Sequence, residues 1–205
     1  LLVSELGTRP MKIQSQTFER LVLGQLFETT GPREGQDLLD HYIAVIEGKT
    51  GSLIAAAGEY GSLLSGASEE VISMVKAYGE LVGVAFQLAD DVIDIVSDGK
   101  TSGKTRGTDL REGVPTLPTI LLDRAVAAGD ESAIAVRALL DADLSSDAAL
   151  EAAVEALAAH PVTQEAWQIA YDWADRAIAA IALLPESTAK AALESFAHAV
   201  VHREG

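Results

Sequence analysis

The chain has 205 residues, a formal net charge of −16 and no cysteine. Non-specific nucleic-acid binding needs a basic surface, so this charge argues against it, and the lack of cysteine excludes disulfides, thiolate metal sites and thiol nucleophiles. Because 48% of the residues are hydrophobic, we expect a substantial core rather than disorder. No apolar run reaches the roughly 18 residues of a membrane span, and no charged leader precedes an apolar core, so neither a signal peptide nor a location outside the cytoplasm is expected. The chain opens at Leu1 without methionine, which is typical of a fragment or a processed form.

The first part of the chain has the spacing of helices. A short helical tail ends at Gly7, and Thr8 with Pro10 begins a helix that runs to about residue 28. Further helices are expected over residues 35–47 and 52–64. The apolar residues of the helix after Thr8 are expected to form one buried stripe, made of Ile13, Phe18, Leu21, Val22 and Leu26.

The segment Gly48-Lys49-Thr50-Gly51 separates the helices over 35–47 and 52–64. Two glycines around a Lys-Thr pair predict a kink, where backbone amides, an ammonium group and a hydroxyl can meet one anion. An ordinary helix break with an exposed lysine explains the same residues, and the four positions alone do not separate the two interpretations.

Residues 69–96 contain no proline and read as one long helix that is apolar nearly all round, which is typical of a buried helix. Ser68 is a suitable N-cap, and acidic residues follow it in the first turn. Gly79 and Gly83 are four residues apart within this helix. Their spacing predicts close packing against a neighbouring helix.

Three aspartates stand near the end of this otherwise apolar helix. Asp90 and Asp94 are four residues apart and share one face, which Gln87 joins, while Asp91 lies about 100° further round. Carboxylates this close repel each other unless a cation lies between them or one keeps a proton. Mg²⁺ prefers carboxylate oxygens, keeps part of its water and often shares phosphate ligands. The spacing therefore predicts a Mg²⁺ and phosphate site inside a helical bundle.

Residues 97–115 form the only long polar loop that the sequence predicts. Four of the chain's basic residues lie in it: Lys100, Lys104, Arg106 and Arg111. Cations so close to a carboxylate cluster favour a lid over an anion held by metal, although a solvated loop with chance basic residues is the alternative.

The rest of the chain is alanine-rich and helical, and no segment alternates with the period of a strand. The four histidines are scattered singly and are expected to be structural or exposed, and the aromatic residues between 167 and 173 are expected in a core or a subunit contact. Helices are expected over residues 116–127, 131–140, 146–159, 162–183 and 187–202.

Three segments, in this order, resemble the trans-type isoprenyl diphosphate synthases, the polyprenyl synthetases. The first is Gly48-Lys49-Thr50. The second, Phe86-Gln87-Leu88-Ala89-Asp90-Asp91-Val92-Ile93-Asp94, is similar to the family's second aspartate-rich motif. The third comprises Gly103-Lys104, Gly107-Thr108-Asp109-Leu110-Arg111-Glu112-Gly113 and Thr116-Leu117-Pro118. A lone D-D-x-x-D is a weak signal in an acidic protein, but F-Q-x-x-D-D-x-x-D followed by this loop is a strong one.

The resemblance covers nearly the whole chain and implies an all-α fold, a single-domain helical bundle around a deep central cavity. Residues 1–205 would be the C-terminal part of that domain. The implied activity is that of a prenyltransferase, which joins an allylic prenyl diphosphate head-to-tail to isopentenyl diphosphate. Mg²⁺ assists the loss of pyrophosphate, the isopentenyl double bond attacks the allylic carbocation, and a proton is lost. The expected protein is a homodimer with no nucleic-acid partner and no transmembrane segment.

The resemblance also implies a role for each matching residue in the aspartate motif. Asp90 is the direct Mg²⁺ ligand, and Asp91 and Asp94 hold metal directly or through water. Phe86 lies against the isopentenyl group, and Gln87 contacts the allylic diphosphate.

On either side of that motif, Lys49 and Lys104 are expected to bind the allylic diphosphate, and Thr50 to contact it. A diphosphate leaves only when its charge is neutralised, so both lysines are expected to be catalytic together with Asp90 and Asp91.

The sequence departs from the family pattern in two places. The family's first aspartate-rich motif lies before the matched region, and no such pattern occurs upstream of Thr50. The chain is therefore expected to begin after this motif, which supplies half of the metal site and most of the isopentenyl diphosphate site. Some members also carry a lysine where this chain has Gly113-Val114, so a third lysine contact is not expected.

Two other functions are consistent with the same residues. The chain is also compatible with a non-catalytic subunit that pairs with a complete synthase, which the missing first motif favours. A class I terpene cyclase shares the fold and the metal-diphosphate trigger, but Lys49-Thr50 with Lys104 fits a chain-elongating enzyme better.

Overall fold

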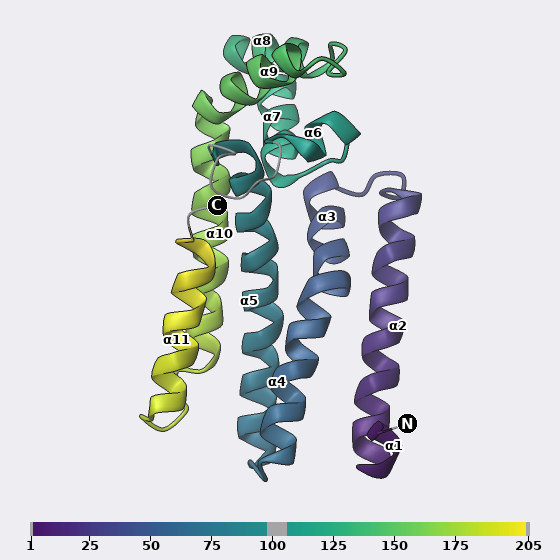
Figure 1. Ribbon diagram of the computed structural model, residues 1–205, viewed down its shortest axis with the longest axis vertical. Helices are drawn as coiled ribbons and strands as arrows, with labels where there is room; N and C mark the ends of the chain where they lie inside the picture. The colour runs from purple at the N-terminus through teal and green to yellow at the C-terminus, as the bar shows by residue number, and fades with distance from the viewer. Residues whose placement is uncertain (1, 98–105, 204–205) are drawn as a thin grey trace. The chain divides into compact units, whose positions relative to one another are not determined.

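A computed structural model describes residues 2–97 and 106–203 of the chain (Figure 1). The helices of the first half are α1 (Leu2–Glu5), α2 (Thr8–Thr30), α3 (Leu38–Ile46), the π-helix η1 (Glu47–Gly51), α4 (Ser52–Leu64) and α5 (Glu69–Val96). Those of the second half are α6 (Thr108–Glu112), α7 (Leu117–Ala127), α8 (Glu131–Leu140), α9 (Asp147–Ala159), α10 (Pro161–Ala180) and α11 (Thr188–Val201). The described ranges contain no strand, and the predicted all-α class is confirmed.

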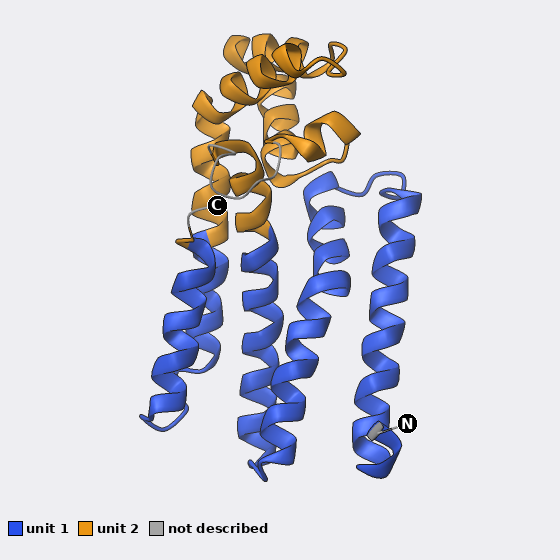
Figure 2. Cartoon of the chain, in the orientation of Figure 1, with its two compact units in different colours: residues 1–87, 171–201 blue, residues 88–170, 202–205 orange. Residues whose placement is uncertain are grey.

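The chain divides into two compact units (Figure 2). Unit 1 comprises residues 1–87 and 171–201, and unit 2 comprises residues 88–170 and 202–205. The helices α5 and α10 each pass from one unit into the other. The two units share continuous helices, so the division into units does not decide whether residues 1–205 form a single domain. The single domain stays a prediction.

The helix starts follow the capping residues in the sequence. Asp37 accepts hydrogen bonds from the backbone of Leu39 and Asp40, so α3 begins at residue 38 and not at the predicted residue 35. Gly35 has a φ of 77°, a left-handed conformation that ends any helical run there. Asp130 caps α8 in the same way as Asp37 caps α3, and the bounds of α8 agree with the prediction.

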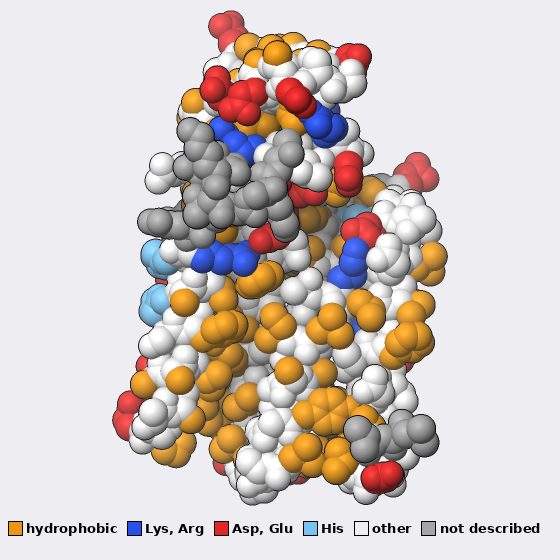
Figure 3. Space-filling view, in the orientation of Figure 1, with side chains coloured by type: hydrophobic (Ala, Val, Ile, Leu, Met, Phe, Trp, Pro, Cys, Tyr) orange, Lys and Arg blue, Asp and Glu red, His pale blue; other side chains and the backbone are white. Residues whose placement is uncertain are grey.

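The predicted apolar stripe of α2 is wrong for most of its members. Ile13 is buried, but Phe18, Val22 and Leu26 are 63%, 48% and 51% exposed. Apolar side chains reach the surface along α2 in Figure 3. The helix instead turns a face with Gly24 toward η1, because the absence of a side chain allows the two backbones to approach closely.

The predicted close packing of the glycines in α5 is confirmed within unit 1. A Cβ atom added at Gly79 would lie 2.8 Å from Cα of Ala55, and one added at Gly83 would lie 2.8 Å from Cα of Gly51. Side chains cannot fit at these distances, so α5 lies directly against α4 and η1.

Among the described helices, α5 alone is long and apolar enough to cross a membrane. An 18-residue window of α5 has a mean hydropathy of 1.3, and 44% of this window is buried. Val82, Leu88 and Val92 have no exposed surface at all. A buried core helix passes the same test of length and composition as a membrane span, and these buried side chains identify α5 as such a core helix.

Tyr78 provides a test of the packing of α5 in unit 1. Its hydroxyl donates a hydrogen bond of 2.7 Å to the Leu193 carbonyl, and burial raises its pKa from 10.0 to about 12. The fold favours the neutral phenol, so the stability that this group contributes is fully present below pH 10 and is lost as the pH rises through about 12. Denaturant titrations at stepped pH should show this loss, and Tyr78→Phe should lower stability by about 1 kcal/mol at neutral pH and remove its share of the alkaline loss.

Unit 2 has its own core. The helix pairs α7–α8 and α8–α9 pack against each other, and α6 contacts α9. Leu117, Leu122 and Leu157 are completely buried. A cavity of about 510 Å³ lies where the α9–α10 turn meets Val96, and Trp167 lines it.

Candidate functional site

The Lys-Thr segment forms a π-helical turn, so the ordinary helix break that was the alternative interpretation is not present. The backbone continues from α3 through η1 into α4, and the amide of Ser52 donates to the carbonyl of Glu47. A π-helix bonds its amides to carbonyls five residues back. Contrary to the prediction, these amides are therefore not available to an anion. The Lys49 ammonium instead lies 2.6 Å from a carboxylate oxygen of Glu28 in α2, and it remains partly exposed.

The turn is held between two helices of unit 1. Added Cβ atoms at Gly24 and Gly48 would each lie 3.1 Å from backbone atoms of the other segment, so α2 and η1 are in close contact. Arg20 of α2 donates to the Glu47 carbonyl and forms an ion pair with Glu80 of α5. Burial, followed by the nearby charge of Glu80, raises the pKa of the Glu47 carboxyl above its ordinary value.

Thr50 links the turn to α5. Its hydroxyl donates a hydrogen bond of 3.2 Å to the side-chain oxygen of Gln87. Phe86 and Gln87 are both half-buried and belong to the last turn of α5 within unit 1. Unit 1 thus brings together Thr50 and Gln87, two residues that the sequence predicted for one site.

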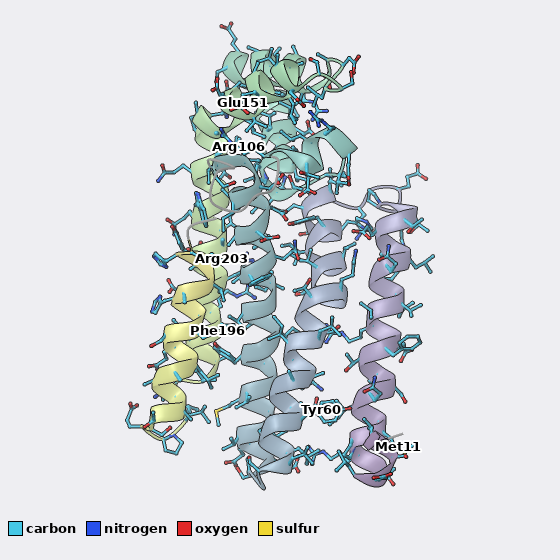
Figure 4. All side chains as sticks on the ribbon, in the orientation of Figure 1. Met11, Tyr60, Arg106, Glu151, Phe196 and Arg203 are labelled. Carbon is cyan, nitrogen blue, oxygen red and sulfur yellow. The ribbon has the colours of Figure 1, made fainter. Side chains whose placement is uncertain are left out.

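Asp90 is the exposed aspartate of the motif. Its side chain is 51% exposed and lies 2.8 Å from a guanidinium nitrogen of Arg203. Arg203 follows α11 near the end of the described chain, as labelled in Figure 4. No local pattern in the sequence predicts this pair, because 113 residues separate the two side chains.

Asp91 and Asp94 fasten parts of unit 2. Asp91 is 5% exposed, and one of its carboxylate oxygens accepts a hydrogen bond of 3.2 Å from the Leu117 amide at the start of α7. A carboxylate oxygen of Asp94 lies 3.4 Å from the Asp109 amide, and its backbone carbonyl accepts a bond of 2.9 Å from Gly107. Both aspartates therefore place the segment that follows residues 98–105.

The donor set suits a hard cation. The aspartates offer carboxylate oxygens, which Mg²⁺ prefers, and Asp90 presents its oxygens to solvent. In the part of the chain that the structure describes, no three His, Asp or Glu side chains gather to hold one ion. Mg²⁺ commonly binds through one or two carboxylates plus water and phosphate oxygens, and the exposed carboxylate of Asp90 offers donor atoms of this kind.

The basic residues of the predicted lid divide into two pairs. Lys100 and Lys104 lie outside the described residues. Arg106 pairs with Glu151 and donates to the Ile95 carbonyl, and Arg111 pairs with Asp147. Figure 4 labels the first of these pairs. Both arginines thus bind acidic side chains of α9. The sequence had instead favoured a role for them as cations of a lid over an anion.

A comparison with protein families matches residues 2–157 to the family described as polyprenyl synthetase. The chain is 40% identical over 204 residues to the nonaprenyl diphosphate synthase of Mycobacterium tuberculosis, covering 100% of this chain and 60% of that protein. It is 31% identical to the octaprenyl diphosphate synthase of Escherichia coli, covering 99% of this chain and 62% of that protein. The chain thus spans about three fifths of the length of these relatives.

A solved structure gives the same result. The geranylgeranyl pyrophosphate synthase from Corynebacterium glutamicum, complexed with calcium and isoprenyl diphosphate, is similar with a TM-score of 0.88 and 40% identity. The similarity covers 100% of this chain and 62% of that one.

Proposed function

Because this chain belongs to the polyprenyl synthetase family, we propose that it carries part of a trans-prenyltransferase site. The reaction is the head-to-tail condensation of an allylic prenyl diphosphate with isopentenyl diphosphate. Since the chain covers about 60% of the relatives' length, this activity is proposed for the protein at its natural length.

One observation carries the proposal. The Thr50 hydroxyl is bonded to Gln87, and Gln87 stands three residues before Asp90 on the continuous helix α5. The Lys-Thr turn and the aspartate motif are separate in the sequence, and this bond connects the turn to the helix that carries the motif. A diphosphate leaves most readily when a lysine and a carboxylate-bound metal together neutralise its negative charge.

The residues have the following proposed roles. Asp90, with Asp91 and Asp94, holds Mg²⁺, which when bound neutralises the departing pyrophosphate. Lys49 and Lys104 hold the allylic diphosphate oxygens. The prenyl chain would lie in the deep cavity that the family resemblance implies, among the apolar helices.

Three further residues, in the Lys-Thr turn and at the start of the aspartate motif, have proposed roles in substrate binding. Thr50 and Gln87 orient the diphosphate, and Phe86 packs on the isopentenyl group. The hydrogen bond between Thr50 and Gln87 supports a shared task for these two side chains.

A condensation assay tests the function. The natural-length protein is incubated with an allylic diphosphate, radiolabelled isopentenyl diphosphate and Mg²⁺, and longer prenyl diphosphates are expected, with none after chelation by EDTA. Release of pyrophosphate without use of isopentenyl diphosphate would instead indicate a terpene cyclase. Turnover only after a complete synthase is added would indicate a non-catalytic subunit.

We also propose that the protein is a homodimer in which a second copy covers the exposed face of α2. Phe18, Val22 and Leu26 follow each other at four-residue intervals and are about half exposed or more, and an apolar face of this kind is typical of an interface. Light scattering should give a dimer for the natural protein and a monomer for Phe18→Asp. A monomeric natural protein would exclude this interface.

We propose a cytoplasmic location for the protein. The absence of cysteine is compatible with a reducing compartment. Cell fractionation provides the check, and recovery in the membrane fraction would contradict the proposal.

A further inference from the structure

The Arg20 side chain joins the Lys-Thr turn to both helices around it. Its Nη2 atom lies 3.3 Å from the Glu47 carbonyl oxygen, at the first residue of η1. The same nitrogen forms the ion pair with Glu80 of α5. The guanidinium therefore connects α2, the turn and α5 at a point two residues before Lys49, and all of these contacts lie within unit 1.

The turn that Arg20 contacts has an unusual geometry. A π-turn contains one residue more than an α-turn, and such turns are rare and frequently occur at functional sites. If η1 relaxed to an α-helix, the residues on one side of it would rotate by about 100° relative to those on the other. Such a rotation would turn the Thr50 hydroxyl away from Gln87, which accepts its hydrogen bond at 3.2 Å in the present register.

Glycines alone do not fix this register. The contacts of Gly24 with Gly48 and of Gly51 with Gly83 allow the turn to fit between α2 and α5, but they carry no directional bond. The Glu47 carbonyl accepts both the Ser52 amide and the Arg20 guanidinium. Glu80 holds the guanidinium in place from the side of α5.

We propose that Arg20 and Glu80 are positioning residues, which hold η1 in its π-helical register and so place Lys49 and Thr50 for the allylic diphosphate. This inference rests on the proposed prenyltransferase function. Neither residue contacts the diphosphate in this proposal, because both act through the Glu47 carbonyl. Their loss should therefore raise the KM for the allylic diphosphate and leave the KM for isopentenyl diphosphate unchanged.

The chain offers a matched control for this proposal. Arg9 and Glu69 form a second ion pair between α2 and α5, and both of its side chains are exposed at 41% and 75%. Arg9 stands near the start of α2, eleven positions before Arg20, so this ion pair does not involve the part of α2 that contacts η1. Arg9→Gln therefore removes the same kind of α2–α5 pair without touching the turn.

The experiment compares Arg20→Gln, Arg20→Lys, Glu80→Gln and Arg9→Gln in the natural-length protein by steady-state kinetics with each substrate varied in turn. Arg20→Gln is expected to raise the KM for the allylic diphosphate about tenfold, because small displacements of a binding group are costly, with the KM for isopentenyl diphosphate unchanged. Arg20→Lys, which keeps one charged donor, should recover part of the loss. Glu80→Gln should raise the allylic KM less than Arg20→Gln, and Arg9→Gln should not raise it.

Each other result has a definite meaning. An allylic KM for Arg20→Gln equal to that of Arg9→Gln, in folded proteins by circular dichroism, would overturn the proposal. Equal rises in both KM values would also overturn it, because they would indicate general damage to the fold. If Arg20→Gln does not fold, Glu80→Gln decides by the same comparison. Absence of condensation in the unmodified protein would refute the proposed function itself, so the two failures are distinguishable.

Discussion

Replacing Asp90 with alanine is expected to lower kcat at least about a hundredfold, while the protein stays folded. Asp90 presents the most solvent-accessible carboxylate of its motif, and we propose that it is a direct ligand of Mg²⁺. Removing it takes away a metal ligand where the charge of the leaving group develops. The fold should not depend on this side chain, because an exposed pair such as Asp90–Arg203 contributes about 1 kcal/mol or less.

Steady-state kinetics of the natural-length protein, with circular dichroism as the check on folding, measures this effect. Asp123→Ala is the matched control, because Asp123 is 48% exposed, belongs to unit 2 and also pairs with an arginine, Arg137. That variant should keep its activity. Near-normal turnover of a folded Asp90→Ala protein would refute the metal role.

The second large effect concerns the closest backbone contact of the π-turn. Gly83→Ala is expected to destabilise the protein by about 1 to 2 kcal/mol, which is the cost of overpacking less the gain in helix propensity. The new methyl group would meet the backbone of Gly51 at 2.8 Å, and backbone atoms cannot swing away as the end of a side chain can. Thermal unfolding should show a melting temperature lower by about 2 to 8 °C.

The same substitution at Gly61 should have the opposite sign. Gly61 is also a helical glycine of unit 1, but a Cβ atom added there meets nothing within 4 Å. Gly61→Ala should therefore raise stability by about 0.5 to 1 kcal/mol through helix propensity alone. A Gly83→Ala protein as stable as the Gly61→Ala protein would contradict the close packing of α5 on η1.

Local signals in the sequence predicted most of the helices because those signals act within a few residues. Asp130 and Ser146 cap α8 and α9 through amides two or three positions ahead, so the starts of both helices were readable. The glycine pair in α5 was interpretable for a related reason, since two missing side chains on one face favour a close neighbour.

The failures occurred where a neighbour decided the outcome. The apolar residues of α2 predicted a buried face, but the helix turned Gly24 toward η1 and left Phe18 exposed. Likewise, the glycines around Lys49 predicted a kink with backbone amides free for an anion, whereas contacts with α2 and α5 accompany a continuous π-turn. Periodicity counts apolar side chains and does not register where a backbone must approach another.

By itself, the sequence determined the all-α class, the order of the helices and the presence of three aspartates near the end of α5. These properties depend on spacing along the chain, which the residues fix directly. Only the tertiary structure decided the different surroundings of the three aspartates: Asp90 is exposed beside Arg203, whereas Asp91 and Asp94 bond to backbone amides. It also decided that Arg20 reaches Glu80, because a partner sixty positions away leaves no trace in local spacing.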